Sequence, residues 1–479
     1  MTSQRALKLN LTVGALTLAI PFLFPEVTSA HAFGATYTLP LPSWIFLYGG
    51  AATVALSFLL VSFFVGEKGG PAKLRQIDIR LVQWLTGRIA VLIGKGAGLM
   101  LWVGLVLAGY LGSQDTTTNI APTLFWVVFL LGFTYLTAIF GDLWSVVSPF
   151  RTMADLLEKL VGGEWWGKVP YPRILSYIPA VIFYYLLIYN ELLSGGQAAI
   201  PANLAGLVLL YSLITMAGVV VFGREAWWKY GESLSVFFRL VSKISPIGRE
   251  GERIYLRIPG TSLLQESADS MWLVLFIIFM LASTAFDGFR GTTIWFQWDL
   301  SAYDYYSSLG QTGYQLFHAL ALAAAPLVFL AAYLLSIWGM KRVTGSKDSV
   351  RDLAKKFAFS LIPIAVVYNI AHYYSLLLTQ GQSFIILISD PLGKGWNLLG
   401  TAGFTPNVGI MRADFIWYSQ VFFIVAGHVG AVIISHVIAL RTEKSVRKAA
   451  IGQLPLLILM VLYTLTGLWI LSQPYSFKG

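Results

Sequence analysis

The sequence predicts an all-α, polytopic bundle of membrane-spanning helices, and its composition, its hydropathy and the placement of its charges all favour that fold class. Of 479 residues, 57% are hydrophobic and 12% are charged, and the mean hydropathy is +0.70. So apolar a chain is typical of a protein embedded in a lipid bilayer. The net charge of +10 could suggest nucleic acid as a partner. The basic residues alternate with long apolar runs, however, so the bilayer is the expected partner and no nucleic acid is expected.

The first 30 residues have the pattern of a cleaved signal peptide. A basic start, with Arg5 and Lys8, precedes an apolar run over residues 11–24 and the small residues 28–30, which suit signal peptidase. Cleavage after residue 30 would leave one membrane domain, residues 31–479. An uncleaved anchor helix is the alternative.

Ten later segments are apolar and long enough to cross a bilayer as helices, which takes about 20 residues. An extended stretch with two prolines, residues 39–42, separates them from the signal peptide. We expect spans near residues 43–65, 90–112, 122–141, 174–194, 203–222, 271–288, 313–338, 357–380, 416–440 and 453–472.

The basic residues predict the orientation of these spans. Of the 31 Lys and Arg residues after residue 30, 27 lie in five alternate loops: 66–96, 148–173, 223–270, 341–356 and 441–449. Lys and Arg accumulate in cytoplasmic loops. This asymmetry predicts a bacterial inner membrane protein with both mature termini outside the cytoplasm.

Three loops have a distinctive content. The loop 223–270 contains an amphipathic piece around residues 234–243, which we expect to lie on the inner leaflet. The outer loop 288–312 is rich in Trp and Tyr, and the outer loop 381–415 is rich in Gly. Aromatic residues at this level usually anchor a protein among the lipid headgroups, and a substrate-binding lid is the alternative.

Histidines at membrane depth are the main candidates for chemistry, because ionisable groups there are costly and usually functional. At 1.5 Å per residue, Asp287 lies at the outer surface, with His318, His372 and His428 roughly 8, 12 and 18 Å below it. Tyr368, Asn369, His372 and Ser375 form one helical stripe, and Gly427, Ala431 and Ser435 form a small-residue seam beside His428. Both patterns turn these histidines toward the bundle interior.

These four residues predict a metal pocket in the outer half of the membrane. Neutral imidazoles of His318, His372 and His428 with the carboxylate of Asp287 could hold a zinc-like divalent ion and leave one position for water. The ion would acidify that water and polarise an electrophile. His372, His428 and Asp287 are therefore the candidate catalytic residues. No cysteine is present, so thiolate sites and covalently attached haem are excluded.

Several alternatives stay open. The histidines could simply hydrogen-bond across helices. Paired histidines on different helices could also hold b-type haem, with His428 and His436 serving two sites at different depths. A mature N-terminal His31 could chelate copper. Glu191 and Asp142 could be polar groups at helix ends or members of a proton path.

Five stretches resemble the bacterial fenitrothion hydrolase-like, or organophosphate hydrolase-like, family of integral membrane proteins. They are AHAFGATYTLPLP at residues 30–42, AFDG at 285–288, AHYYSLLLTQGQ at 371–382, SDPLGKGWNLLGTAG at 389–403 and AGHVGAVIISHVIAL at 426–440. The resemblance implies hydrolysis of a phosphorothioate triester, and it carries over no catalytic residue.

The expected function is therefore a membrane hydrolase of a lipophilic, organophosphate-type ester, possessing a His/Asp metal pocket that meets substrate from the bilayer. The alternatives are a transporter or metal-handling membrane protein, and a subunit of a respiratory or redox membrane assembly.

Overall fold

The structure is a computed structural model that describes residues 29–32, 35–38, 41–64, 77–78, 87–162, 166–251, 253–407, 409–443 and 445–473. The predicted signal peptide, residues 1–30, lies almost wholly outside the described residues. The side chain of His31, the candidate copper ligand, lies outside them too.

Within the described residues, nine helical segments are long and apolar enough to cross a membrane. They are α2 (Ser43–Phe64), α3 (Arg88–Leu111), Ile120–Phe140, α9 (Pro201–Phe222), α12 (Met271–Arg290), Thr293–Thr344, Val350–Gln380, α18 (Ala413–Thr442) and Val446–Ser472. A tenth apolar helix, α8 (Ile178–Leu193), has 16 residues. Each of the ten expected spans overlaps one of these helices. The all-α, multi-pass fold class is confirmed.

Four of the long segments consist of successive helical pieces. These pieces are α4 (Ile120–Pro122), η2 (Thr123–Phe133) and α5 (Thr134–Phe140); α13 (Thr293–Tyr306), η7 (Ser307–Leu309) and α14 (Gly310–Thr344); α15 (Val350–Phe357), η8 (Ala358–Leu361) and α16 (Ile362–Gln380); and α19 (Val446–Gly452) and α20 (Leu454–Ser472). The piece η2 is a π-helix of 11 residues. Such wide turns are rare inside helices and often occur at functional sites.

Short elements connect the spans. The helical ones are α6 (Trp144–Val147), α7 (Pro149–Val161), η3 (Gln197–Ala199), α10 (Arg224–Ala226), η4 (Trp227–Gly231), α11 (Ser233–Val241), η5 (Ser242–Ile244), η6 (Thr261–Leu264) and α17 (Ser383–Leu387). Strands β1 (Ser29–Ala32) and β2 (Ala35–Thr38) form an antiparallel pair. Strands β3 (Ile77–Asp78), β4 (Ile247–Glu250) and β5 (Arg253–Leu256) form a small antiparallel sheet in the order β3-β5-β4.

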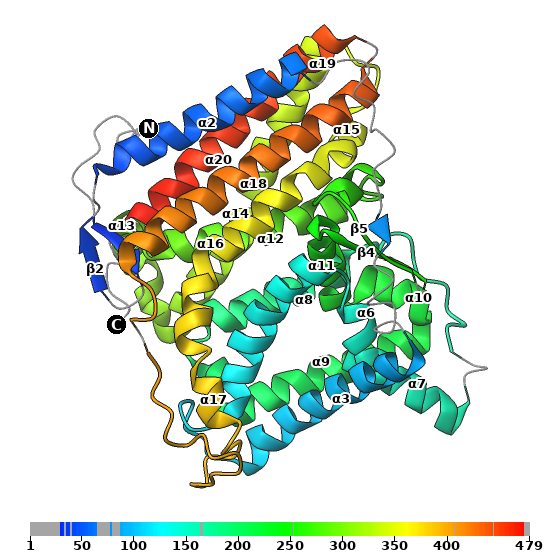
Figure 1. The fold of residues 1–479 in the computed structure, drawn as a ribbon, viewed down its shortest axis with the longest axis vertical. Coiled ribbons are helices and arrows are strands. Elements are labelled where there is room, and N and C mark those ends of the chain that lie inside the picture. Colours follow the sequence, from blue (N-terminus) through cyan, green and yellow to red (C-terminus); the bar gives the residue numbers. More distant parts are fainter. Residues whose placement is uncertain are drawn as a thin grey trace.

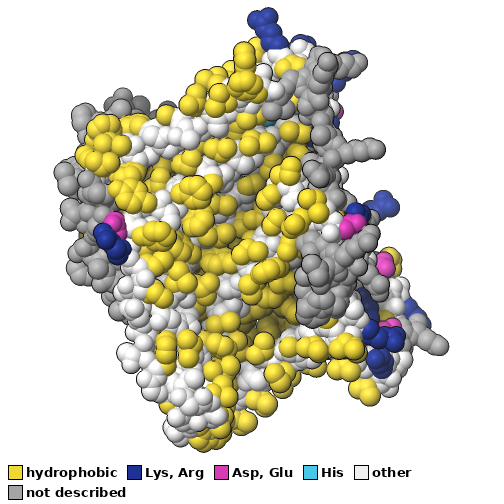
Figure 2. Space-filling view, in the orientation of Figure 1, with side chains coloured by type: hydrophobic (Ala, Val, Ile, Leu, Met, Phe, Trp, Pro, Cys, Tyr) yellow, Lys and Arg dark blue, Asp and Glu magenta, His cyan; other side chains and the backbone are white. Residues whose placement is uncertain are grey.

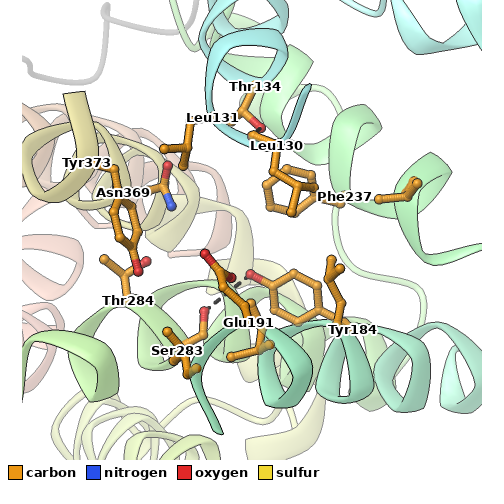
Figure 3. A pocket seen from close by; sticks show the side chains of 14 residues that line it. Leu130, Leu131, Thr134, Tyr184, Glu191, Phe237, Ser283, Thr284, Asn369 and Tyr373 are labelled. Atoms are coloured by element: carbon orange, nitrogen blue, oxygen red, sulfur yellow. Dashed lines mark hydrogen bonds between the residues drawn. The ribbon is translucent and has the colours of Figure 1, made fainter. Parts of the chain in front are cut away.

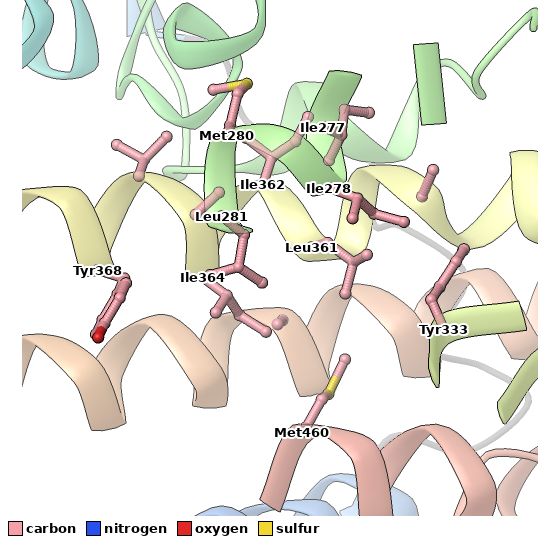
Figure 4. Close-up of a cluster of buried hydrophobic side chains, with 14 of the residues drawn as sticks. Ile277, Ile278, Met280, Leu281, Tyr333, Leu361, Ile362, Ile364, Tyr368 and Met460 are labelled. Carbon is pink, nitrogen blue, oxygen red and sulfur yellow. The ribbon is translucent and has the colours of Figure 1, made fainter. Parts of the chain in front are cut away.

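The helices surround two separate hydrophobic cores. In Figure 1, α2, α20, α18 and α16 lie side by side in one part of the molecule, and α3 and α9 lie in another. The larger core belongs to the first group and to α12 and α14, and Figure 4 shows part of it, including Ile277, Leu361 and Met460. The smaller core is rich in aromatic rings, among them Trp102 and Phe150. Helices α8 and α11 lie between the two groups.

The outer surface is apolar, as contact with lipid requires. In Figure 2 hydrophobic side chains cover much of the face, and Lys and Arg side chains lie mainly along the right-hand edge. Helix α3 is the clearest case, because only 11% of the residues in its most apolar stretch are buried inside the protein. A charged edge beside a broad apolar face fits a protein that is embedded in a bilayer.

Small residues allow the closest helix contact in the larger core. A Cβ atom on Gly427 of α18 would lie 2.9 Å from the Cβ atom of Val367 and 3.2 Å from the carbonyl oxygen of Pro363, both from α16 or its start. Ala431 and Ser435, on the same seam, are buried. The predicted seam is therefore a packing face, and it brings the two histidine-bearing helices together.

Helix α11 corrects the expected position of the amphipathic piece in loop 223–270. Seven of its nine residues are buried, and it packs between the two helix groups instead of lying on the inner leaflet. The fully buried Glu232 caps it, since its carboxylate accepts hydrogen bonds from the backbone N–H groups of Leu234 (2.9 Å) and Ser235 (2.6 Å). The hydrophobic stripe predicted for this segment is present in α11, but it faces protein instead of lipid.

The two segments that were predicted to be outer loops both contain regular structure. The aromatic segment forms helix α13, in which Trp295 and Tyr306 are buried while Trp298 and Tyr305 are exposed. Only the second pair could anchor the protein among headgroups. The first pair packs on the ends of α12 and α14, through rings such as Phe286 and Phe317.

The Gly-rich segment 381–415 joins the two helix groups. Its carbonyl groups at Pro391 and Leu392 accept backbone hydrogen bonds from Ile120 (3.3 Å), the first residue of α4, and Ser113 (2.8 Å), just after α3. Gly393 makes this approach possible, because its φ is +64° and a Cβ atom there would lie 2.9 Å from the carbonyl oxygen of Thr118.

Candidate functional site

Asp287, near the end of α12, accepts two hydrogen bonds on one carboxylate oxygen. The Tyr373 hydroxyl donates to Oδ2 at 2.7 Å, and Nε2 of His372 lies 3.2 Å from the same atom. His372 is 4% exposed and the Asp287 side chain is 13% exposed. Because Nε2 faces the carboxylate, it carries the ring proton, and Nδ1 is left as an acceptor. Nδ1 is buried and has no hydrogen-bond partner among the described residues.

The local sequence explains how these three side chains meet. Tyr368, His372 and Ser375 are all buried, so the predicted polar stripe of α16 does face the interior. Gly288 follows Asp287 on α12, and a Cβ atom there would lie 3.2 Å from Cε1 of His372. A glycine at this position therefore leaves room for the imidazole ring beside the carboxylate.

A small cavity with polar and apolar side chains in its lining lies next to this group, between the two helix groups. Its space for water-sized molecules is about 40 Å³, enough for one or a few waters. It is lined by parts of η2, α5, α8, α11, α12 and α16. Figure 3 shows Tyr184 and Glu191 of α8 and Tyr373 of α16 facing it.

Polar groups converge on this cavity in a setting that is otherwise apolar. The Tyr184 hydroxyl and Oγ of Ser283 are 3.2 Å apart, and both line the cavity. Oδ1 of Asn369 is buried without a hydrogen-bond partner among the described residues. Unsatisfied buried oxygens are rare, so a water or a polar ligand in the cavity would complete the bonding of Asn369. Tyr373 joins the two parts of the site, because it lines the cavity and donates to Asp287.

His318 belongs to a second Tyr–Asp–His group, on α13 and α14. Its Nε2 lies 3.6 Å from Oδ1 of Asp299, which also accepts a hydrogen bond from the Tyr306 hydroxyl at 2.8 Å. Its Nδ1 lies 2.9 Å from the carbonyl oxygen of Tyr314. His318 thus has a carboxylate partner different from the one predicted.

The two histidines of α18 bind within or close to their own helix. Nδ1 of His428 lies 2.8 Å from the carbonyl oxygen of Ile424, and its Nε2 is buried without a partner among the described residues. Nδ1 of His436 lies 3.3 Å from Oε1 of Gln453, whose amide donates to the Ser435 carbonyl. The cross-helix hydrogen bonding that was the alternative to metal binding is therefore present at His436.

The predicted four-ligand set is only partly assembled. The structure brings Asp287 and His372 together, while His318 pairs with Asp299 and His428 with Ile424. No group of three or more His, Asp or Glu side chains that could hold a metal ion occurs in the described part of the chain.

Several important groups escaped the sequence analysis. Tyr373 is adjacent to His372, and Asp299 lies in the aromatic segment, but neither was singled out. Asp142 was expected at a helix end and is found there, because its carboxylate accepts from the backbone N–H of Ser145 (3.2 Å) at the start of α6. Glu191 lines the cavity, so only it has the surroundings expected of a proton-path residue.

This arrangement is suited to holding and passing protons. The imidazole of His372 and the phenol of Tyr373 each lie within hydrogen-bond distance of the Asp287 carboxylate, and a second carboxylate lines the adjoining cavity. Comparisons with protein-family models, curated proteins and solved structures return no match for this chain.

Proposed function

We propose that the protein is a proton-coupled membrane transporter of a small polar solute, located in the bacterial inner membrane. The observation that carries the proposal is the small cavity, with Glu191 and several other polar side chains in its lining, between two separately packed helix groups. Transporters commonly place their sites between two such units, near broken helices, and move one unit against the other.

Glu191 is the proposed proton carrier. A carboxylate at membrane depth is costly unless a proton or a partner compensates its charge. In the cavity it faces the hydroxyl groups of Tyr184 and Ser283 and the amide of Asn369. These groups could hydrogen-bond a polar solute together with the proton, so that the two move together.

The Asp287–His372–Tyr373 group is the proposed proton store beside the cavity. Tyr373 lines the cavity and also donates a hydrogen bond to Asp287. A change in the bonding of its hydroxyl therefore links the charge of Asp287 to the presence of a solute or proton in the cavity. Nδ1 of His372 offers a further proton acceptor. A proton can therefore move within this group without crossing an apolar barrier.

The test is solute-driven proton movement in proteoliposomes. Protein reconstituted with a trapped pH-sensitive dye is exposed to small solutes by class: carboxylic acids, amino acids, sugars and inorganic ions. We expect one class to change the internal pH in the wild type and to lose that effect in Glu191→Gln.

Glu266→Gln is the matched control. Glu266 is 62% exposed and pairs with Lys243 away from the cavity, so this variant should keep wild-type proton movement. Equal proton movement in Glu191→Gln and the wild type would remove Glu191 from the mechanism. Absence of solute-driven movement for every class would count against transport.

A second candidate is the hydrolase predicted from the family resemblance, and the His372–Asp287 pair favours it. The carboxylate orients the ring so that Nδ1 is an acceptor, as in a general base. Nδ1 would take a proton from water, the water oxygen would bond to phosphorus, and the phenolate would leave. The present cavity is far smaller than an aryl phosphotriester, so this reaction requires the helix groups to part.

Hydrolysis is tested by the release of nitrophenol from an aryl phosphotriester by protein in detergent. We expect a hydrolase to lose activity in His372→Gln and to keep it in His436→Gln, because His436 bonds to Gln453. Equal rates in both variants would mean that His372 does not act as the base.

A further inference from the structure

A second, larger hollow opens on the face that carries the basic loops, which is predicted to be cytoplasmic. Its volume is about 550 Å³, and it lies among α3, α7, α10, η4 and α11. Five cationic side chains line it: Lys95, Arg151, Arg224, Lys229 and Arg239. Only two carboxylates, those of Asp155 and Glu225, line it with them.

Three of these cations form ion pairs with nearby carboxylates. Asp155 accepts from Lys95 at 2.7 Å and from Arg224 at 2.7 Å, and Arg224 also pairs with Glu158 at 2.6 Å. Lys229 lies 3.6 Å from Asp269. The remaining two, Arg151 and Arg239, form no direct ion pair among the described residues.

Arg151 has the strongest need for an anion. It forms no ion pair within 4 Å with a carboxylate of the described residues, and its Nε is buried without a hydrogen-bond partner among them. Its guanidinium lies over the Trp228 ring, 5.3 Å from the centroid. Burial lowers the pKa of Arg151, although the more distant carboxylates of Asp142, Glu232 and Asp155 oppose this shift. Arg239, on the same wall, donates to the backbone carbonyls of Trp228 (3.4 Å) and Lys229 (2.8 Å).

We propose that this hollow binds a phosphate-bearing anion, and that its occupant is the headgroup of an anionic phospholipid from the surrounding leaflet. A guanidinium removed from water regains most from an ionised partner, and the planar fork of arginine matches phosphate oxygens. Basic pockets between membrane helices at the cytoplasmic side commonly hold anionic headgroups.

An adjoining hollow favours a lipid over a free anion. It has a volume of about 600 Å³, shares Arg224 and Lys229 with the first, and is lined by the rings of Trp166, Phe222 and Tyr230. Free phosphate would fill only the charged part. A phospholipid has both a phosphate for the arginines and an apolar portion for the aromatic rings.

The test compares the thermal unfolding of the delipidated protein in detergent with added phosphatidylglycerol, phosphatidylcholine or inorganic phosphate at matched ionic strength. We expect phosphatidylglycerol to raise Tm more than phosphatidylcholine does. Arg151→Gln should lose more than half of that difference, because it removes the unpaired guanidinium. Arg173→Gln is the matched control: Arg173 is exposed, belongs to the predicted cytoplasmic loop 148–173 and lines neither hollow, so this variant should keep the full difference.

The outcomes separate the sources of the anion. No shift with inorganic phosphate supports the lipid, whereas a shift as large as that of phosphatidylglycerol overturns the choice of a lipid. An equal lipid-dependent difference in the wild type, Arg151→Gln and Arg173→Gln overturns the site altogether. If Arg151→Gln does not purify as folded protein, Lys229→Gln decides, because Lys229 lines both hollows. An unchanged difference in that variant would then reject the proposal.

Discussion

Replacing Tyr373 with Phe removes one oxygen atom from the point where the cavity meets the buried carboxylate. The lost hydrogen bond, 2.7 Å from hydroxyl to Oδ2 of Asp287, lies in a buried setting. Hydrogen bonds to charged groups contribute about 1.5–3 kcal/mol to stability. We therefore expect Tyr373→Phe to lower the free energy of unfolding by about that amount and to reduce solute-driven proton movement sharply.

The next residue provides the matched control. The Tyr374 hydroxyl bonds to Oγ of Ser419 and to the carbonyl of Ile416, which are neutral partners away from the cavity. Tyr374→Phe should lower the free energy of unfolding by about 0.5–1.5 kcal/mol and leave proton movement unchanged. Unfolding in mixed detergent micelles gives the stabilities, and the trapped dye gives the proton movement. If Tyr373→Phe behaves like Tyr374→Phe in both assays, Tyr373 does not link the cavity to Asp287.

Two further predictions concern stability. Gly427→Ala should lower the free energy of unfolding by about 1–3 kcal/mol, because its Cβ atom would lie 2.9 Å from a Cβ atom of α16. Gly49→Ala is the control and should leave the free energy of unfolding unchanged, because the added atom has open space around it. Partial burial alone would raise the pKa of Asp155, but Lys95 and Arg224 hold it below its usual value of 3.8. The ionised Asp155 therefore stabilises the folded protein fully well above pH 3.8. This stabilisation is lost as the pH falls through the lowered pKa that Asp155 has in the folded state. Tm measured against pH should show the wild-type advantage over Asp155→Asn at neutral pH disappearing in acid.

The helix positions could be predicted because they depend on local properties of the chain. Length and apolarity define each span, and the spacing of Tyr368, His372 and Ser375 shows which side of α16 is polar. Burial of these three side chains confirms that the stripe faces inward. A polar stripe facing lipid would be too costly, so its direction follows from the sequence alone.

The partners of the polar side chains could not be predicted in the same way. Depth along a helix places His318 near Asp287, but the rotation of α14 and the folding of α13 give it Asp299 instead. The amphipathic pattern of α11 is equally compatible with a leaflet surface and with a slot between two helix groups. Only the packing of distant helices, such as α8 and α16, decides between them.

The cavity between the helix groups is tested most directly by thiol labelling, since the natural chain has no cysteine. Ser283→Cys places a thiol at the cavity, and Ser360→Cys places one in the larger core, where Ser360 is fully buried. A membrane-impermeant thiol reagent is applied to each side of proteoliposomes, with and without a pH gradient. We expect Ser283→Cys to react from one side at a rate that the gradient changes, and Ser360→Cys to stay unreactive. If the cavity thiol is as unreactive as the core thiol on both sides and under both conditions, the helix groups do not open and the proposed transport mechanism is wrong.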